Sequence, residues 1–331
     1  MAEKERADPF VQALAGWQPA RVLMAANRLG IFAVLGENAL PAEEVASRCD
    51  CQPRSMALLL NACVALGFLT KARGLYSNTP ASLHSLVPGK PTYLGDAINH
   101  SDHLWAAWSH LDEAVRTNHP VGQAPFASDP TVHRDFILAM HNRAMRIGPL
   151  LADALDLTGR RQLFDAGGGP GTFSIFLVRR YPGLRAIVFD LPPTIEIARQ
   201  IIAGSGVADR IALRAGDYFK DDLGQGNDVV LLSAVLHALG PARCEELLNK
   251  AYHSLVSGGL VVVHEQLIDR DGTSPLGAVL FSLNMLVNTD EGQSYSADEI
   301  TRWMRNAGFQ DPRVKPLPAP ARASLVIATK P

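Results

Sequence analysis

The sequence predicts an α/β protein in which an N-terminal winged-helix domain precedes a C-terminal, doubly wound parallel sheet with an added edge. Three observations support this fold class. Helical segments near the N-terminus are followed by a hairpin pattern. From Arg160 onward, short apolar runs alternate with helical segments, which is typical of parallel β-α units. The first of these runs ends in a glycine-rich turn at residues 167–171, where a ligand could approach the backbone closely.

Composition limits the classes of protein that fit. With 331 residues and 47% hydrophobic content, the chain can bury one large core or two modest ones. A formal net charge of −2 argues against a polyanion such as nucleic acid as the main partner. The four cysteines include no Cys-x-x-Cys pair, so the sequence indicates neither a zinc cage nor a disulfide framework. Without a signal-type segment or a membrane-spanning run, we expect a cytoplasmic protein that does not bind membranes.

Residues 1–95 form the first predicted domain. Apolar stripes at helical spacing, a break at Gly30, and prolines near helix starts indicate three helices, and turn residues between two short apolar runs indicate a hairpin. We expect helices over residues 9–35, 40–46 and 53–66, and strands over 68–70 and 75–77. Helices followed by such a wing are typical of the winged-helix variant of the helix-turn-helix fold.

A winged helix raises the possibility of DNA binding. A recognition helix should present several polar side chains to base edges. The helix over 53–66 carries Arg54 and Asn61 but is otherwise mostly apolar, which favours packing against protein. We therefore predict a homodimer through residues 1–95 rather than a DNA complex.

Residues 96–155 are predicted to be a helical linker that contributes to a substrate pocket. We expect interruptions at Pro120, Pro125 and Pro130. His100 and His103 could share a helix face, but no nearby acid or cysteine completes a metal-binding set, so we predict no metal site.

Phe136 and Met140 are four positions apart in the linker, which places them on one helix face. Two interpretations remain open: core packing, or a lid over an aromatic substrate. The predicted substrate-pocket residues are Phe136, Met140, Phe281, Asn284 and Met285.

Residues 156–331 form the predicted doubly wound domain. We expect strands over residues 162–165, 185–190, 211–215, 228–233, 260–265, 313–316 and 324–329, and helices near 171–180, 193–203, 241–255 and 297–307. Ligands of such sheets bind beyond the carboxyl ends of the strands. The side chains that follow these ends are Asp165, Asp190, Asp217, His237 and Glu265. Their convergence at one sheet edge predicts a ligand site.

The glycine turn discriminates between cofactors. A nicotinamide fingerprint has glycines at its first, third and sixth positions, whereas here Gly167 and Gly169 place Thr172 at the sixth. An acid just before the turn, Asp165, suits a cationic ligand better than a pyrophosphate. We therefore predict a site for S-adenosylmethionine.

Each predicted contact to this cofactor follows from the position of a side chain. Asp190, at the end of the second strand, can accept hydrogen bonds from two ribose hydroxyl groups. Asp217 can accept from the adenine amine while the adjacent aromatic side chain covers the ring. The predicted cofactor residues are Asp165, Gly167, Gly169, Asp190, Leu191, Asp217, Tyr218 and Ser233.

His237 is the predicted catalytic base, because it follows the fourth strand near the expected methyl group and could take a proton from a phenol or enol. Glu265 is its predicted catalytic partner. In a strand, His264 and Glu265 point to opposite faces, so only one of them should reach His237, and we prefer Glu265.

Taken together, the motifs resemble those of the two-domain small-molecule O-methyltransferases that act on caffeate, acetylserotonin, carotenoid hydroxyls and polyketide aromatics. The matching pieces are residues 66–70, Phe136 with Met140, 165–171, 190–192, 216–219, 235–237, 258–259 before Glu265, and 307–309. The resemblance covers essentially the whole chain. It implies a class I methyltransferase domain, a homodimer through the N-terminal domain, metal-independent methyl transfer and His237 as base.

Two positions depart from this family. The family base is usually followed by Asp-Trp, whereas this chain has Ala238-Leu239, and Ser294 stands where the family has a second orienting acid. Some relatives of the fold bind the cofactor but hydroxylate, decarboxylate or rearrange their substrates. Two alternatives to O-methyl transfer therefore remain open: such a non-methylating enzyme, and a non-enzymatic winged-helix regulator that senses S-adenosylmethionine.

Overall fold

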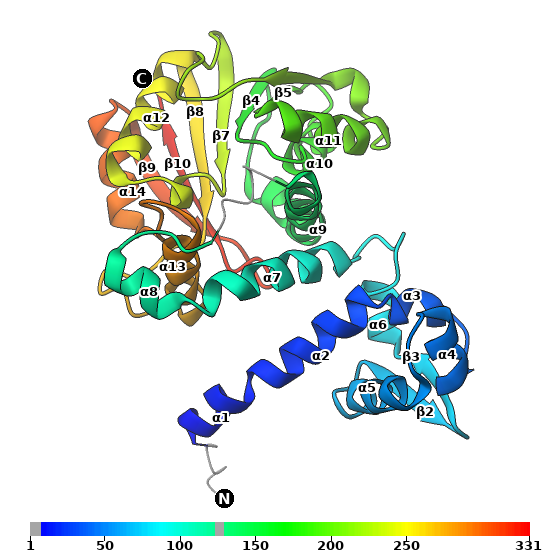
Figure 1. Ribbon diagram of the computed structural model, residues 1–331. Helices are drawn as coiled ribbons and strands as arrows, with labels where there is room; N and C mark the ends of the chain where they lie inside the picture. Colours follow the sequence, from blue (N-terminus) through cyan, green and yellow to red (C-terminus); the bar gives the residue numbers. More distant parts are fainter. Residues whose placement is uncertain (1–7, 123–128) are drawn as a thin grey trace, which may run out of the picture. The chain divides into compact units, whose positions relative to one another are not determined.

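The computed structural model describes residues 8–122 and 129–331. The chain divides into two compact units, Met1–His103 and Leu104–Pro331, and each is described by itself (Figure 1). The predicted interruption at Pro125 lies outside the described residues. Within the described ranges, none of the helices combines the length and apolar character that crossing a bilayer requires.

The first unit contains the predicted helices and wing. Its elements are α1 (Pro9–Ala15), α2 (Trp17–Arg28), α3 (Ile31–Leu35), β1 (Leu40–Pro41), α4 (Ala42–Arg48), α5 (Pro53–Ala65), β2 (Leu69–Ala72), β3 (Leu75–Asn78) and α6 (Pro80–Ser85). The strands form an antiparallel sheet in the order β1-β3-β2. Helix α7 (Gly95–Trp108) crosses the boundary between the units.

Two sequence-based boundaries in this unit were wrong. The helical segment expected over residues 9–35 does break at Gly30, as predicted, but it is also divided at Gly16, which gives three helices. The helix expected from residue 40 begins at Ala42, because Leu40 and Pro41 pair with strand β3 instead.

The turn of the wing, between β2 and β3, consists of Arg73 and Gly74. Both residues have positive φ angles (51° and 82°), as a two-residue hairpin turn requires.

Asn61, one of the two polar residues of α5 considered for base contacts, is used inside the domain. Its side-chain oxygen accepts hydrogen bonds from the Tyr76 hydroxyl (2.8 Å) and from Lys71 Nζ (3.1 Å). Tyr76 is 2% exposed and belongs to the core of this unit, so these bonds tie α5 to the wing.

The second unit contains a seven-stranded sheet in the order β6-β5-β4-β7-β8-β10-β9. Its strands are β4 (Gln162–Ala166), β5 (Arg185–Asp190), β6 (Ile211–Ala215), β7 (Asn227–Ser233), β8 (Leu255–Glu265), β9 (Gln310–Pro316) and β10 (Ser324–Thr329). Strands β4 to β8 pair in parallel, and β10 and β9 add an antiparallel edge. The predicted fold class is confirmed.

Helices cover both faces of this sheet (Figure 1). The helices of this unit are α8 (Leu111–Thr117), α9 (Pro130–Ala154), α10 (Thr172–Arg180), α11 (Pro192–Ala203), α12 (Pro241–Ser254), α13 (Leu276–Asn288) and α14 (Ala297–Asn306), with short 3₁₀ turns at Ala208–Arg210 and Leu236–Ala238. Helices α8 and α13 pack against each other rather than on a face of the sheet. Strand β7 shows why two layers are needed. Val230 and Leu232 join the core under α12 and α14, whereas Val229 and Leu231 join the core under α9, α10 and α11.

Two details of this unit differ from the sequence-based expectation. Pro130 does not interrupt a helix but begins α9 at a position where a proline is tolerated, and Asp129 caps that helix by accepting from the Thr131 amide. Helix α13 was not predicted, because apolar residues occupy most of its positions on every side and leave no clear helical periodicity to detect.

Candidate functional site

The carboxyl ends of four parallel strands bring the predicted polar side chains to one edge of the sheet. Asp165 lies near the end of β4, Asp190 ends β5, Ser233 ends β7 and Glu265 ends β8. Because these strands are neighbours in the order β5-β4-β7-β8, their ends form a continuous edge.

The glycine turn connects β4 to α10 along this edge. Gly167 and Gly169 have φ angles of 71° and 54°, a region that favours glycine. A Cβ atom on Gly167 would lie 2.8 Å from Val235 Cγ2, so no side chain fits there. A Cβ atom on Gly169 would meet no atom within 4 Å, so the backbone is open on that side.

Asp190 is fixed by the turn that it faces. Its Oδ2 accepts from the Gly169 amide (2.8 Å), and its Oδ1 accepts from the Leu191 amide (2.7 Å). The Thr194 side chain also hydrogen-bonds this carboxylate, and the remaining acceptor capacity can serve a ligand hydroxyl group. Burial raises the pKa of Asp190, while the two backbone hydrogen bonds oppose that shift.

Asp165 is a buried acid with unused hydrogen-bonding capacity. Its Oδ2 accepts from the Ser174 hydroxyl (2.6 Å), whereas its Oδ1 has no hydrogen-bond partner among the residues that the structure describes. Burial raises the pKa of Asp165 to about 7, and the nearby Asp190 adds to this shift. A buried acceptor of this kind fits a cationic donor such as an ammonium group.

Asp217 and Tyr218 follow strand β6. Asp217 Oδ1 accepts from the Phe219 amide (2.9 Å), which lowers the pKa of Asp217, and its Oδ2 lies 3.1 Å from Lys220 Nζ. Burial raises the pKa of Tyr218 to about 12, so this phenol is neutral near pH 7. The Tyr218 ring packs edge-on against Phe219 and lies 3.6 Å from the position that a Gly167 Cβ would take.

His237 and Glu265 are in direct contact. His237 lies in the 3₁₀ turn after β7, and its Nδ1 is 2.7 Å from Glu265 Oε2. The His237 backbone amide also donates to Glu265 Oε1 (3.3 Å). The ring of Phe281, on α13, packs edge-on against the imidazole at 4.7 Å between ring centroids. Since an ionised carboxylate only accepts hydrogen bonds, Nδ1 carries a proton and Nε2 is left as the acceptor.

His264 faces the other side of the sheet. Its Nδ1 is 2.8 Å from the Ser233 hydroxyl, and its ring meets Phe173 edge-on. Burial lowers the pKa of His264 to about 4, which keeps the ring neutral. The hydroxyl of Ser233, a predicted cofactor residue, is therefore in contact with His264, which the sequence did not indicate.

The predicted substrate-pocket residues lie on two helices of the second unit. On α13, Phe281 contacts His237, Met285 is buried, and the Asn284 side-chain oxygen accepts from Trp108 Nε1 (3.0 Å). Phe136 and Met140 are half-buried on α9, which packs against α10.

His141, next to Met140, extends the contact between α9 and α10. Its Nδ1 lies 2.7 Å from the Thr172 hydroxyl, directly after the glycine turn, and sequence reasoning missed this link. The only indication in the sequence was the neighbouring pair of Phe136 and Met140, which already assigned this helix face to a pocket.

Ser294, which occupies the position of the family's second acid, does not face the base. Its hydroxyl donates to the Ala278 carbonyl (2.9 Å), so Glu265 is the carboxylate that contacts His237. In the described parts of the chain, no group of three or more histidine, cysteine, aspartate or glutamate side chains could hold a metal ion.

A parallel sheet whose edge carries a glycine turn, buried acids and a histidine–glutamate pair defines an enzyme of the class I methyltransferase type. Residues 103–310 match the family model of an O-methyltransferase domain, and residues 12–87 match that of an O-methyltransferase dimerisation domain. The chain therefore belongs to the O-methyltransferase family.

Individual relatives agree with this family. The chain is 35% identical to 3-hydroxy-5-methyl-1-naphthoate 3-O-methyltransferase of Streptomyces sahachiroi, covering 94% of this chain and 91% of that protein. It is also 35% identical to the tetracenomycin polyketide synthesis 8-O-methyl transferase TcmO of Streptomyces glaucescens, covering 94% and 93%. The crystal structure of human N-acetylserotonin methyltransferase in complex with SAM superimposes with a TM-score of 0.89, at 30% identity over 100% of this chain and 99% of that chain. These matches favour methyl transfer over both alternatives left open by the sequence.

Proposed function

We propose that this enzyme transfers the methyl group of S-adenosylmethionine to a hydroxyl group of an aromatic or polyketide-like small molecule, with His237 as general base. The contact between His237 and Glu265, on the same sheet edge as the glycine turn, carries the proposal. Relatives named for a naphthoate and for a tetracenomycin polyketide support this class of substrate.

The residues that would hold the cofactor have complementary chemistry. Asp190 would accept from the ribose hydroxyl groups, and the unused oxygen of Asp165 would accept from the ammonium group. Asp217 would accept from the adenine amine. We further assign Gly167 and Gly169 to the backbone cradle, and Leu191, Tyr218 and Ser233 to its surroundings. When bound, the cofactor supplies an electrophilic methyl group on a sulfonium.

The proton of the substrate hydroxyl would move to His237 Nε2. Glu265 holds the Nδ1 proton, which fixes the tautomer that leaves Nε2 free to accept, and its negative charge stabilises the imidazolium that forms. Glu265 is 5% exposed, so water screens this interaction weakly. Phe281 packs against the ring and limits its rotation. With Phe136, Met140, Asn284 and Met285, it would line the substrate pocket.

Methyl transfer can be tested directly. The purified protein is incubated with S-adenosylmethionine and a panel of phenols and hydroxylated polyketides, and products are analysed by mass spectrometry. We expect a product with one added methyl group on oxygen, together with binding of S-adenosylhomocysteine in titration calorimetry. Cofactor binding without methylation of any panel member, accompanied by another change in the substrate, would contradict the proposed reaction.

Cofactor affinity should depend on pH through Asp165. Because the pKa of Asp165 is raised to about 7, its carboxyl group is largely protonated below that pH and must lose the proton to pair with an ammonium group. We expect affinity for S-adenosylhomocysteine to fall by up to about tenfold per pH unit below 7. Calorimetry from pH 5.5 to 8 measures this affinity. The Asp165→Asn variant should bind S-adenosylhomocysteine weakly, and its affinity should not change with pH in this range.

The same group affects the stability of the cofactor-free protein. The folded-state pKa of Asp165 lies above its ordinary value of 3.8, so the folded state binds this proton more tightly than the unfolded state. Stability should therefore be lost as the pH rises from 3.8 towards 7. The measurement is the melting temperature of the parent and of Asp165→Asn across this pH range. If both melting temperatures changed with pH in the same way, the expected loss of stability through Asp165 would be contradicted.

We also propose that the enzyme is a homodimer through residues 1–95, with residues 96–155 contributing to the substrate pocket and 156–331 holding the cofactor. Helix α1 buries none of its residues within the chain, and Phe10 and Leu14 on it are 76% and 75% exposed. Apolar side chains on a dimerisation domain are typical of a subunit interface.

Charges on this helix should separate the subunits. We expect the parent to be a dimer in light scattering and Phe10→Glu/Leu14→Glu to be a monomer at micromolar concentration, because each carboxylate would be desolvated at the interface. Val115→Glu is the matched control, since Val115 is also exposed (61%) but lies on α8 in the other unit. A monomeric parent, or an unchanged double variant, would contradict the assignment.

A further inference from the structure

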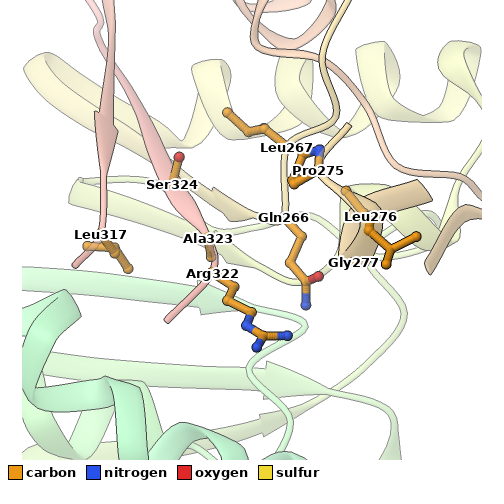
Figure 2. Close-up of a pocket in the computed structure, with 10 residues that line it drawn as sticks. Gln266, Leu267, Pro275, Leu276, Gly277, Leu317, Arg322, Ala323 and Ser324 are labelled. Carbon is orange, nitrogen blue, oxygen red and sulfur yellow. The ribbon is translucent and has the colours of Figure 1, made fainter. Parts of the chain in front are cut away.

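A cavity of about 500 Å³ opens in the second unit at the edge of the sheet (Figure 2). Its walls come from three places: the residues after β8, the start of α13, and the loop between β9 and β10. This volume is within the range of cavities that bind small molecules.

The cavity is lined by residues from the same segments that carry the histidine–glutamate pair and the ring packed on it. Gln266 lines it and follows Glu265 in the chain, and Ser324 lines it and pairs with Glu265 in the register of β8 and β10. Ala278 lines it as well, and Phe281, one helical turn further along α13, packs against His237. The lining residues are thus neighbours, in sequence, in strand register or along α13, of residues that contact His237.

Most of the residues that line the cavity are apolar, and the polar side chains of Gln266 and Arg322 lie on one side of it. Leu267, Leu276 and Leu317 supply aliphatic surface that suits a fused aromatic ring. In Figure 2 the guanidinium group of Arg322 and the side-chain amide of Gln266 both extend toward the bottom of the view, whereas the leucine side chains lie higher and to the sides.

Arg322 gives the cavity its charge. It is the sole charged residue among those that line the cavity in the described part of the chain, and no ion pair joins it to another described residue. Its φ angle of 48° is unusual for a residue with a side chain and costs conformational energy. A guanidinium that lines an apolar cavity and has no ion pair within the described chain is available to bind an anion.

We propose that this cavity holds the part of the substrate remote from the reacting hydroxyl group and that Arg322 pairs with a carboxylate there. The inference rests on the proposed function and narrows its substrate class to hydroxylated aromatic carboxylic acids. The planar fork of a guanidinium matches a carboxylate with two hydrogen bonds, and the Gln266 amide is a further donor nearby. A dianionic phosphate would be only half neutralised by this single cation, so a carboxylate is the better fit.

The test compares a matched pair of ligands, 3-hydroxy-2-naphthoic acid and 2-naphthol, by calorimetry in the presence of saturating S-adenosylhomocysteine. We expect the parent to bind the acid about tenfold or more tightly than the naphthol, which is the effect of one charge-assisted contact. Arg322→Gln should reduce this preference to less than about threefold, and added NaCl should weaken it in the parent because Arg322 is exposed.

The matched control is Arg313→Gln. Arg313 is exposed on β9, close to Arg322 in sequence, but does not line the cavity, so this variant should keep the parent preference for the acid. Arg322→Gln keeps a Cβ atom and therefore the same backbone strain. If this variant loses the preference for the acid over the naphthol, the loss is due to the missing positive charge. Equal binding of both ligands by the parent, no binding of the acid, or an undiminished preference in Arg322→Gln would each overturn the proposal.

Methylation assays distinguish this inference from the proposed function. If neutral phenols are methylated and the acid is not preferred, the carboxylate site is wrong and methyl transfer to an aromatic hydroxyl stands. If S-adenosylhomocysteine does not bind, the proposed function itself fails, and the assignment of Arg322 fails with it.

Discussion

Replacing His237 with alanine is expected to slow single-turnover methyl transfer by about two to four orders of magnitude, the usual cost of removing a general base. The imidazole is the group whose free nitrogen, Nε2, can take the substrate proton, since Glu265 occupies Nδ1. Cofactor affinity should change little, because Asp165, Asp190 and the glycine turn belong to β4, β5 and their loop.

The pH profile of this variant separates proton abstraction from a structural role. Raising the pH should partly restore the rate of His237→Ala, because a substrate that is already ionised needs no base. Single-turnover rates from pH 6 to 10 measure this restoration. His253→Ala is a matched control on α12, where the imidazole is exposed, and it should transfer methyl at the parent rate.

Glu265→Gln tests the second member of the pair. A glutamine can still accept from His237 Nδ1 but lacks the charge that stabilises the imidazolium, so we expect a smaller loss than for His237→Ala. If His237→Ala transferred methyl at the parent rate at neutral pH, the base assignment would be wrong and positioning alone would account for catalysis.

The sheet could be predicted well because burial on both faces leaves a strong pattern. The strands over 185–190, 211–215 and 324–329 have the predicted bounds, since each is a short apolar run between turn residues. Strand β8 was predicted five residues too short. Its first residues include Gly258 and Gly259, which argue against a strand. The Gly258 amide donates to the Lys330 carbonyl and the Lys330 amide donates to the Gly259 carbonyl, long-range bonds that a sequence pattern does not show.

Site positions that depend on strand ends were predictable, whereas those that depend on long-range contacts were not. Parallel strands put Asp165, Asp190 and Glu265 on one edge whatever the helices do. In contrast, Asn284 accepts from Trp108, 176 positions away, and no local pattern encodes such a pair. The bond between Ser233 and His264 likewise arises only because β7 and β8 are neighbours.

Replacing Asp190 with alanine is expected to weaken cofactor binding by roughly 2–4 kcal/mol, because two hydroxyl groups would lose a charged acceptor. That loss corresponds to a decrease of about 30-fold to nearly 1,000-fold in affinity for S-adenosylhomocysteine. The fold should survive, since burial already disfavours the charge of Asp190 in the free protein, as its raised pKa indicates.

Titration calorimetry on Asp190→Ala, Asp190→Asn and Asp222→Ala checks this expectation. The asparagine keeps one acceptor, so its loss should be intermediate. Asp222 is an exposed acid after β6 whose carboxylate faces Arg214, and its removal should leave affinity unchanged.

Thermal melting separates ligand contact from an effect on the turn, because Asp190 also accepts a hydrogen bond from the Gly169 amide. A weakened affinity with a parent-like melting temperature assigns the effect to ligand contact, whereas an unchanged affinity of Asp190→Ala would remove Asp190 from the cofactor site.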